Sequence, residues 1–222
     1  MDDVLELERH GDVAVITWNA DDNRVNHDSL GAFEAVLDEL EATEGPLAIV
    51  VTGTGKFFSN GLDLDRFAAH PDELVPTVAR FERLMGRLLV FPAYCVAAIN
   101  GHAFAAGAMF SCAFDHRVMR ADRGYFCLNE AEIGMPLTPA MAEVVLGRLP
   151  QATALEAMLT ARRYSATEAI AAGIVEEAVE LDEVLPTAID RAAMAATKHR
   201  KIIAIHKRMV FAGRAEACGY TR

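Results

Sequence analysis

A long stretch without a single Asp, Glu, Lys or Arg runs from Leu88 to Phe114. A membrane-spanning helix needs about 20 consecutive apolar residues, so the stretch has to be tested as one. Pro92 and the polar turn at Asn100–His102 divide it into two pieces, each too short to span a bilayer. We therefore predict a buried strand followed by a buried helix, in a soluble protein without a membrane partner.

Strands and helices alternate along the first two thirds of the chain, and helices dominate after Pro139. Short apolar runs and alternation at period 2 indicate strands, whereas apolar spacings of three and four indicate helices. Ser165 and Glu168 form a capping box, and Gly173 is the matching carboxyl-terminal stop. This order indicates a mixed α/β domain. We expect strands at 4–8, 13–18, 47–51, 95–99 and 117–119, and helices at 29–41, 74–89 and 198–208.

The composition describes a single acidic domain. The chain has 222 residues, and 21 Lys and Arg against 32 Asp and Glu give a net charge of −11. This length allows one sizeable core, and the acidic balance argues against a nucleic-acid partner. The amino terminus resembles no targeting signal, and the four cysteines form no Cys-x-x-Cys pair. These features predict a reducing, cytoplasmic location.

Metal and nucleotide sites find no support in the residue spacings. The seven histidines do not show the spacing of a metal-binding motif. The glycine-rich turn at Thr52–Lys56 is followed by Phe57, where a phosphate-binding loop requires Ser or Thr. We therefore expect no metal and no nucleotide cofactor.

Two turns share one local pattern. The strand at 47–51 leads through a small-residue turn to a helix expected at Leu62, and the strand at 95–99 leads to one near Ala106. The first turn of a helix leaves backbone N–H groups free and carries partial positive charge. Two such ends aimed at one point would bind an oxyanion. On spacing alone, both could equally be ordinary strand-to-helix turns.

The residues in these turns point to a known family. Phe57–Leu64 and Ala97–Gly107 resemble the two oxyanion-hole motifs of the crotonase (enoyl-CoA hydratase/isomerase) superfamily. Asn23–Asn26, Asp115–Val118 and Ala169–Val175 match further landmarks of that family in the same order. The resemblance covers the chain from the first strands to about position 180.

The resemblance implies a spiral of ββα units with a helical carboxyl-terminal region. It places the spiral core at 1–180 and a helical segment for trimerisation and CoA covering at 181–222, within one domain. It also implies assembly as a homotrimer or a dimer of trimers, and a part in fatty acid metabolism. The expected partner is an acyl-CoA thioester, and no cofactor is needed beyond the coenzyme A of the substrate.

The resemblance also assigns the oxyanion hole and the catalytic base. The two donors would be the backbone N–H groups of Leu62 and Ala106. Asn60 and Ala106 replace the family's usual Ala and Gly, and a methyl group at Ala106 would restrict φ and narrow the pocket. Hydratases of the family use two glutamates, and the equivalent positions here are Met109 and Glu130.

One glutamate is sufficient for the isomerase branch of the family. The stretch from Asn129 to Gly134 resembles Δ3,Δ2-enoyl-CoA isomerases, in which a single glutamate moves a proton between C2 and C4. We therefore expect Glu130 to be the catalytic residue. Met109 is interpreted as a core residue, and Glu132, on an extended segment, would point away from Glu130.

Contacts with coenzyme A are expected at two places. Arg24 and Val25 resemble positions over which CoA passes, with backbone contacts only. The basic segment that contains Lys201 and Lys207 resembles a region that meets CoA phosphates, although a solvated helix face is an equal interpretation. The region from Asp63 to Val78 is expected to shape the acyl pocket.

Two other functions compete with the isomerase. One is a different crotonase-type reaction, such as that of an enoyl-CoA hydratase, a dehalogenase-like enzyme or a thioester hydrolase. The other is a catalytically impaired acyl-CoA-binding protein that kept the fold. Turnover of a 3-enoyl-CoA separates the enzyme from the binding protein.

Overall fold

A six-stranded sheet forms the centre of the computed structural model, which describes residues 4–221. The first two strands form an antiparallel hairpin, as expected, and the other pairs in this sheet are parallel. Central strands of parallel sheets are buried on both faces, which explains their continuous apolar runs. In spatial order the strands are β1 (Leu5–His10), β2 (Val13–Trp18), β4 (Ala48–Gly53), β7 (Tyr94–Ile99), β9 (His116–Arg120) and β11 (Glu177–Val179).

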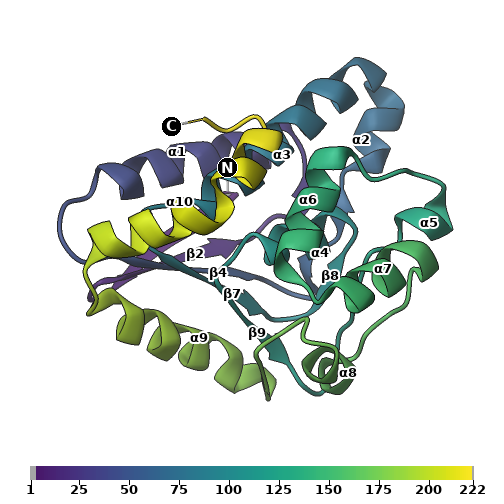
Figure 1. Ribbon diagram of the computed structural model, residues 1–222. Coiled ribbons are helices and arrows are strands. Elements are labelled where there is room, and N and C mark those ends of the chain that lie inside the picture. Colours follow the sequence, from purple (N-terminus) through teal and green to yellow (C-terminus); the bar gives the residue numbers. More distant parts are fainter. Residues whose placement is uncertain (1–3, 222) are drawn as a thin grey trace.

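Two groups of helices cover the two faces of this sheet (Figure 1). Successive strand residues alternate between two hydrophobic clusters, so that Val50 belongs to one and Val51 to the other. Helix α9 (Leu181–Ala196) packs on one face through Val184 and the small residues that follow it at every fourth position. The opposite face shares its core with α1 (His27–Ala42), α3 (Leu74–Leu89) and α4 (Ala106–Cys112).

Short strands form a second layer and produce the repeat of the fold. The strands β4, β7 and β9 are each followed by a short strand of a three-stranded sheet and then by a helix. These short strands are β5 (Phe57–Ser59), β8 (His102–Phe104) and β10 (Phe126–Cys127). A further pair, β3 (Arg24–Val25) and β6 (Gly61–Leu62), lies beside them. The expected ββα units and the α/β fold class are thereby confirmed.

The rest of the chain is mainly helical, as predicted after Pro139. The capping box of Ser165 and Glu168 is present, and Gly173 has a φ of 69°. No helix within residues 4–221 has the length and apolar composition that crossing a membrane requires. The helices not yet named, three of which precede Pro139, are α2 (Leu64–Ala69), the 3₁₀ helix η1 (Pro71–Glu73), α5 (Glu130–Ile133), α6 (Pro139–Arg148), α7 (Gln151–Thr160), α8 (Ala166–Ala171) and α10 (Arg200–Ala217).

The carboxyl-terminal helices pack on the same core as the rest of the chain. Helix α9 lies on the main sheet, and α10 lies against α3 and α6. Phe211 and Ala215 of α10 belong to the cluster that also contains the residues of α3. The role of the segment 181–222 in trimerisation stays a prediction.

Candidate active site

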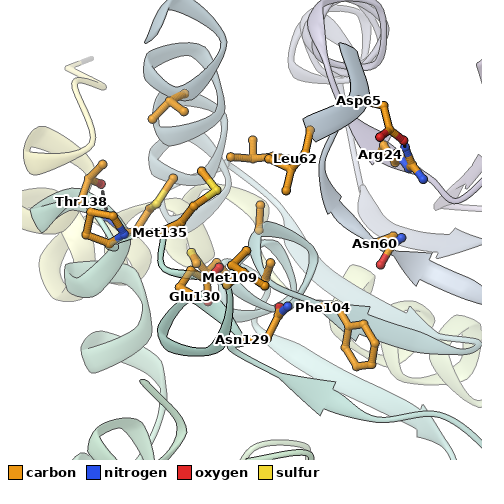
Figure 2. A pocket seen from close by; sticks show the side chains of 17 residues that line it. Arg24, Asn60, Leu62, Asp65, Phe104, Met109, Asn129, Glu130, Met135 and Thr138 are labelled. Carbon is orange, nitrogen blue, oxygen red and sulfur yellow. Dashed lines mark hydrogen bonds and ion pairs between the residues drawn. The ribbon is translucent and has the colours of Figure 1, made fainter. Parts of the chain in front are cut away.

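A cavity of about 320 Å³ brings together most of the residues singled out in the sequence (Figure 2). Leu62, Ala106, Met109 and Glu130 all line it, and Arg24 lies at its rim. Pockets that bind small molecules are mostly apolar with a few converging polar groups, and this cavity has that character. The other lining residues are Asn60, Leu64, Asp65, Val78, Phe104, Ala105, Asn129, Ile133, Met135, Pro136, Thr138 and Met141.

The N–H group of Ala106 is positioned by the start of α4. Ala106 is the first residue of the helix, so its N–H has no acceptor within the helix. The residue before it, Ala105, has a strained backbone with a φ of 49° and a ψ of −124°. A bond from the Ala105 N–H to the Cys127 carbonyl oxygen, at 2.9 Å, holds this conformation. The sharp change of direction points the first turn of α4 at the cavity.

Leu62 belongs to a strand, and the helix expected to begin there begins at Leu64 instead. The Asp63 side chain caps that helix by accepting from the Arg66 N–H, at 3.2 Å. The Asp63 N–H donates to the Val25 carbonyl oxygen, at 3.0 Å. Successive N–H groups of a strand point to opposite sides, so the Leu62 N–H points away from β3. The donor assigned to Leu62 is therefore a strand N–H and not a helix terminus.

Gly61 allows the two candidate donors to approach each other. Its φ is 84°, and a Cβ at this position would lie 2.9 Å from the Ala105 Cβ and 3.3 Å from the Ala106 nitrogen. A side chain therefore cannot be accommodated, and β6 passes directly against the start of α4. This close approach places Leu62 and Ala106 on one wall of the cavity.

Glu130 is the buried carboxylate of the cavity. The residue is 6% exposed, and Oε2 has no hydrogen-bond partner among residues 4–221. Burial disfavours the charged form and raises the pKa of the Glu130 carboxyl to about 7. A buried and unpaired carboxylate is costly for folding, and such groups concentrate at functional sites. Its geometry suits a group that exchanges a proton with a ligand.

Glu132 lies outside the cavity, although for a reason that differs from the expected one. The segment 130–133 is a helical turn and not an extended strand. Glu132 is exposed and lies 3.6 Å from Arg163 in an ion pair. It is thus separated from Glu130 by the geometry of a helix, and it offers a matched control for substitutions at Glu130.

The raised pKa of Glu130 predicts a pH-dependent effect on stability. Between pH 4.5 and 7, Glu130 ionises in the unfolded chain but stays largely protonated in the folded chain. The free energy of unfolding therefore falls as pH rises through this range. Glu130→Gln cannot ionise and so avoids this loss. The difference in unfolding free energy between Glu130→Gln and the parent should therefore be more favourable to the variant at pH 8 than at pH 4, by up to about 3 kcal/mol. Denaturant titration at both pH values measures this, with Glu132→Gln as the control. A pH-independent difference would contradict the assignment.

Met109 is the residue that the family resemblance places at the first of the two hydratase glutamates. It is 1% exposed, belongs to the core cluster as expected, and also lines the cavity close to Glu130. Asp65 and Glu130 carry the carboxylates among the described lining residues. Asp65 lies at the rim with an 86% exposed side chain and is paired to Arg24 at 2.5 Å. The buried part of the cavity therefore contains one carboxylate.

The sequence did not indicate that residues 133–141 form a wall of the cavity. Ile133, Met135, Thr138 and Met141 line the cavity, whereas the expected region between Asp63 and Val78 contributes only its ends. These residues follow no helical or strand period because they lie on a turn, a loop and the start of α6. The one available signal is their position directly after the motif that contains the base.

The residues predicted to bind CoA fall in different environments. Arg24 lies at the rim of the cavity, where Asp65, Asp22 and Asp63 surround its guanidinium. Val25 is buried and pairs with β6. Lys201 is exposed and lines a separate groove between the start of α10 and the end of α1. Contact of Arg24, Val25 and Lys201 with CoA stays a prediction.

Lys207 is a structural residue, which contradicts its expected contact with CoA phosphates. It is 6% exposed, and its Nζ lies 2.6 Å from Asp115 Oδ2 and donates to the Ala93 carbonyl oxygen at 3.1 Å. The same carboxylate accepts from the Cys95 N–H, at 2.8 Å. The ammonium group therefore ties α10 to the ends of β7 and α4 rather than facing a ligand.

Removal of this ammonium group should destabilise the protein strongly. Lys207→Ala leaves the Asp115 carboxylate buried without its cation, and breaking a buried pair in this way costs about 3–5 kcal/mol. Lys201→Ala, on the exposed side of the same helix, should change the unfolding free energy by less than about 0.5 kcal/mol. Urea denaturation of both variants compares them. Equal stabilities would show that the pair contributes nothing.

Comparisons with known proteins agree with this geometry. The model of the enoyl-CoA hydratase/isomerase family matches residues 8–217. Enoyl-CoA delta isomerase 3 of Arabidopsis thaliana is 33% identical over 180 residues, which cover 78% of this chain and 75% of that protein. A short-chain-enoyl-CoA hydratase of Clostridium acetobutylicum is 30% identical over 192 residues, covering 82% and 71%.

A solved structure extends the likeness to the whole fold. An enoyl-CoA isomerase of Mycobacterium tuberculosis, solved in its apo form, superposes with a TM-score of 0.91 at 28% identity. The superposition covers 99% of this chain and 96% of the other. Together with the family model and the curated relatives, it confirms the resemblance seen in the sequence motifs. This chain belongs to the enoyl-CoA hydratase/isomerase family and has the crotonase fold.

Proposed function

We propose that the protein is a Δ3,Δ2-enoyl-CoA isomerase that uses Glu130 as its only base. The observation that carries this proposal is that the buried part of the cavity contains one carboxylate, that of Glu130, beside the thioether of Met109. Glu130 has an unpaired oxygen in the cavity, and Met109 lines the same cavity. By the family resemblance, Met109 stands where a hydratase has the first of its two glutamates. Relatives named as isomerases and as hydratases both match the chain, so the choice of isomerisation rests on the side chains of the cavity.

The reaction needs one group that both accepts and returns a proton. The Glu130 carboxylate takes a proton from C2 of a 3-enoyl thioester, and the electron pair of that C–H bond spreads over a dienolate. The same carboxyl group then donates the proton to C4, and the double bond comes to lie between C2 and C3. The proton count balances, and no oxidant, reductant or water is consumed.

The dienolate places negative charge on the thioester oxygen. The N–H groups of Leu62 and Ala106 would donate to that oxygen, and one such donor is typically worth about 3–4 kcal/mol at the transition state. The close contact of Gly61 with the start of α4 supports their joint action, because it keeps both donors on one wall. Backbone donors need no reorganisation when the charge develops.

The pKa of Glu130 suits a proton shuttle near neutral pH. At a pKa of about 7, a large fraction is ionised and can accept a proton. The protonated form is also acidic enough to return the proton to carbon. General acid–base catalysis is most efficient when the pKa lies near the working pH. Burial in the cavity thus tunes the group for both halves of the reaction.

The direct test is incubation of the purified protein with a 3-enoyl-CoA. The product, a 2-enoyl-CoA, has its double bond conjugated with the thioester carbonyl and is detected by its ultraviolet absorbance. Formation of this product without added metal or cofactor would support the proposal. Binding of the thioester without turnover would favour a catalytically impaired acyl-CoA-binding protein instead.

Assembly and location stay predictions. A trimer or a dimer of trimers is implied by the family alone. One Arabidopsis relative that is 30% identical over 182 residues is named as peroxisomal, so relatives of this chain occur outside the cytoplasm.

A further inference from the structure

Three methionines from three different elements line the inner part of the cavity. Met109 comes from α4, Met135 from the loop between α5 and α6, and Met141 from α6. Figure 2 shows Met109 and Met135 beside Glu130, on the side of the cavity away from Arg24 and Asp65. Methionine is unbranched and flexible, and it fills irregular gaps and adapts to different ligands.

The backbone that carries Met135 and Met141 is fixed at both ends. The Met135 N–H donates to the Glu130 carbonyl oxygen, at 3.0 Å. At the other end, the Thr138 hydroxyl accepts from the Met141 N–H at 3.1 Å and donates to the Glu82 carboxylate. The backbone next to the base is therefore held in place independently of the rotamers of the two thioethers.

Another part of the lining is apolar, and its α2 portion has few buried residues, whereas α3 is well packed in the core. Leu64 of α2 and Val78 of α3 line it. Helix α2 contains one buried residue, Phe67, and η1 contains none. Segments with few buried contacts open and shift at low free-energy cost. The Thr138 hydroxyl is already engaged, so apart from Glu130 and Asn129 the described residues around this part of the cavity offer an apolar chain no polar side-chain partner.

We propose that Met135 and Met141 determine which acyl chains the site accepts. Different rotamers of these two side chains enlarge or narrow the apolar compartment next to Glu130. This compartment therefore fits unbranched apolar acyl groups of several lengths. The proposal rests on the proposed function because it takes the ligand to be an acyl-CoA thioester. Flexible methionine-rich surfaces serve promiscuous binding proteins in the same way.

The effect is measurable as the dependence of affinity on chain length. Each pair of methylene groups that is buried raises affinity roughly tenfold. In an adaptable compartment this increase continues along the series until the compartment is full. A compartment walled by leucine, which is γ-branched and stiffer, should stop accepting methylene groups earlier.

The experiment compares the parent, Met135→Leu/Met141→Leu and the control Met194→Leu, which changes a 61% exposed methionine on α9. Each is titrated by calorimetry with butyryl-, hexanoyl-, octanoyl- and decanoyl-CoA, which have no double bond to move. Met→Leu conserves volume and is well tolerated in cores. We expect all three proteins to bind butyryl-CoA alike, and the double variant to bind decanoyl-CoA at least tenfold more weakly than the others.

The possible outcomes separate the two proposals. If the double variant shows the chain-length profile of the parent within twofold, the role of the methionines is wrong and the proposed function stands. If the parent binds none of the four thioesters, the proposed function itself fails. Should the double variant unfold, Met135→Leu alone provides the same comparison, because Met135 lies on a half-buried loop.

Discussion

Glu130→Gln is expected to lower the rate of 3-enoyl-CoA isomerisation by about 10²–10⁴-fold, the usual contribution of a positioned acid–base group. Glutamine has the shape of glutamate but cannot accept or return a proton at neutral pH. The backbone N–H groups of Leu62 and Ala106 are untouched, so binding of the thioester should persist. The loss should therefore lie in the turnover number and not in the affinity for the substrate.

The neighbouring glutamate gives this experiment its control. Glu132 lies on the same helical turn, is exposed and pairs with Arg163 outside the cavity. Glu132→Gln should isomerise at the parent rate, which separates loss of the base from disturbance of the turn. Calorimetry with octanoyl-CoA establishes that Glu130→Gln still binds the ligand. Parent-level turnover by Glu130→Gln would show that another group moves the proton.

The fold was predictable from the sequence because its strands and helices have simple hydrophobic patterns. The apolar run at 47–51 overlaps β4, which spans Ala48–Gly53, and the amphipathic pattern at 74–89 coincides with α3. Both patterns follow from burial, which is a local property of the sequence. The ββα spiral itself was predicted from the family resemblance, since periodicity alone indicates only a mixed α/β domain.

Lys207 shows where local patterns fail. The exposed face of α10 carries apolar residues such as Ile205 and Met209, whereas the charged Lys207 points inward. Lys207 thus shares the inward face with Phe211 and Ala215, so hydropathy alone assigns this one side chain to the solvent incorrectly. The partner that makes the inward charge tolerable is Asp115, which lies far away in the sequence. A pairing of this kind is a tertiary property, and spacing along one helix cannot show it.

The geometry around the two candidate oxyanion donors was predicted only in part. The residues Leu62 and Ala106 do line one cavity, but one donor lies on a strand instead of at a helix terminus. The positive φ of Ala105 had no signal in the sequence, because alanine rarely adopts that conformation. It is imposed by the neighbouring strands, which hold the Ala105 N–H on Cys127.

The ratio of two activities in one preparation should distinguish the isomerase from a hydratase. Isomerisation of a 3-enoyl-CoA is expected to be at least 100-fold faster than hydration of a 2-enoyl-CoA, because hydration lacks one positioned base. A hydratase holds a water molecule between two carboxylates near the β-carbon of the substrate. By the family resemblance, Met109 presents a thioether at the first of these positions, and thioether sulfur is only a weak acceptor.

Introducing the missing carboxylate should not restore hydration to the level of a two-glutamate enzyme. Met109 is almost completely buried and lies in the hydrophobic cluster, so the pKa of a carboxyl group introduced by Met109→Glu would be raised. At neutral pH the new group would remain largely protonated and could not activate water. Both rates are measured on the parent with substrates of equal chain length. Hydration as fast as isomerisation would contradict the one-base mechanism, because among the described residues the buried part of the cavity supplies only the Glu130 carboxylate to activate water.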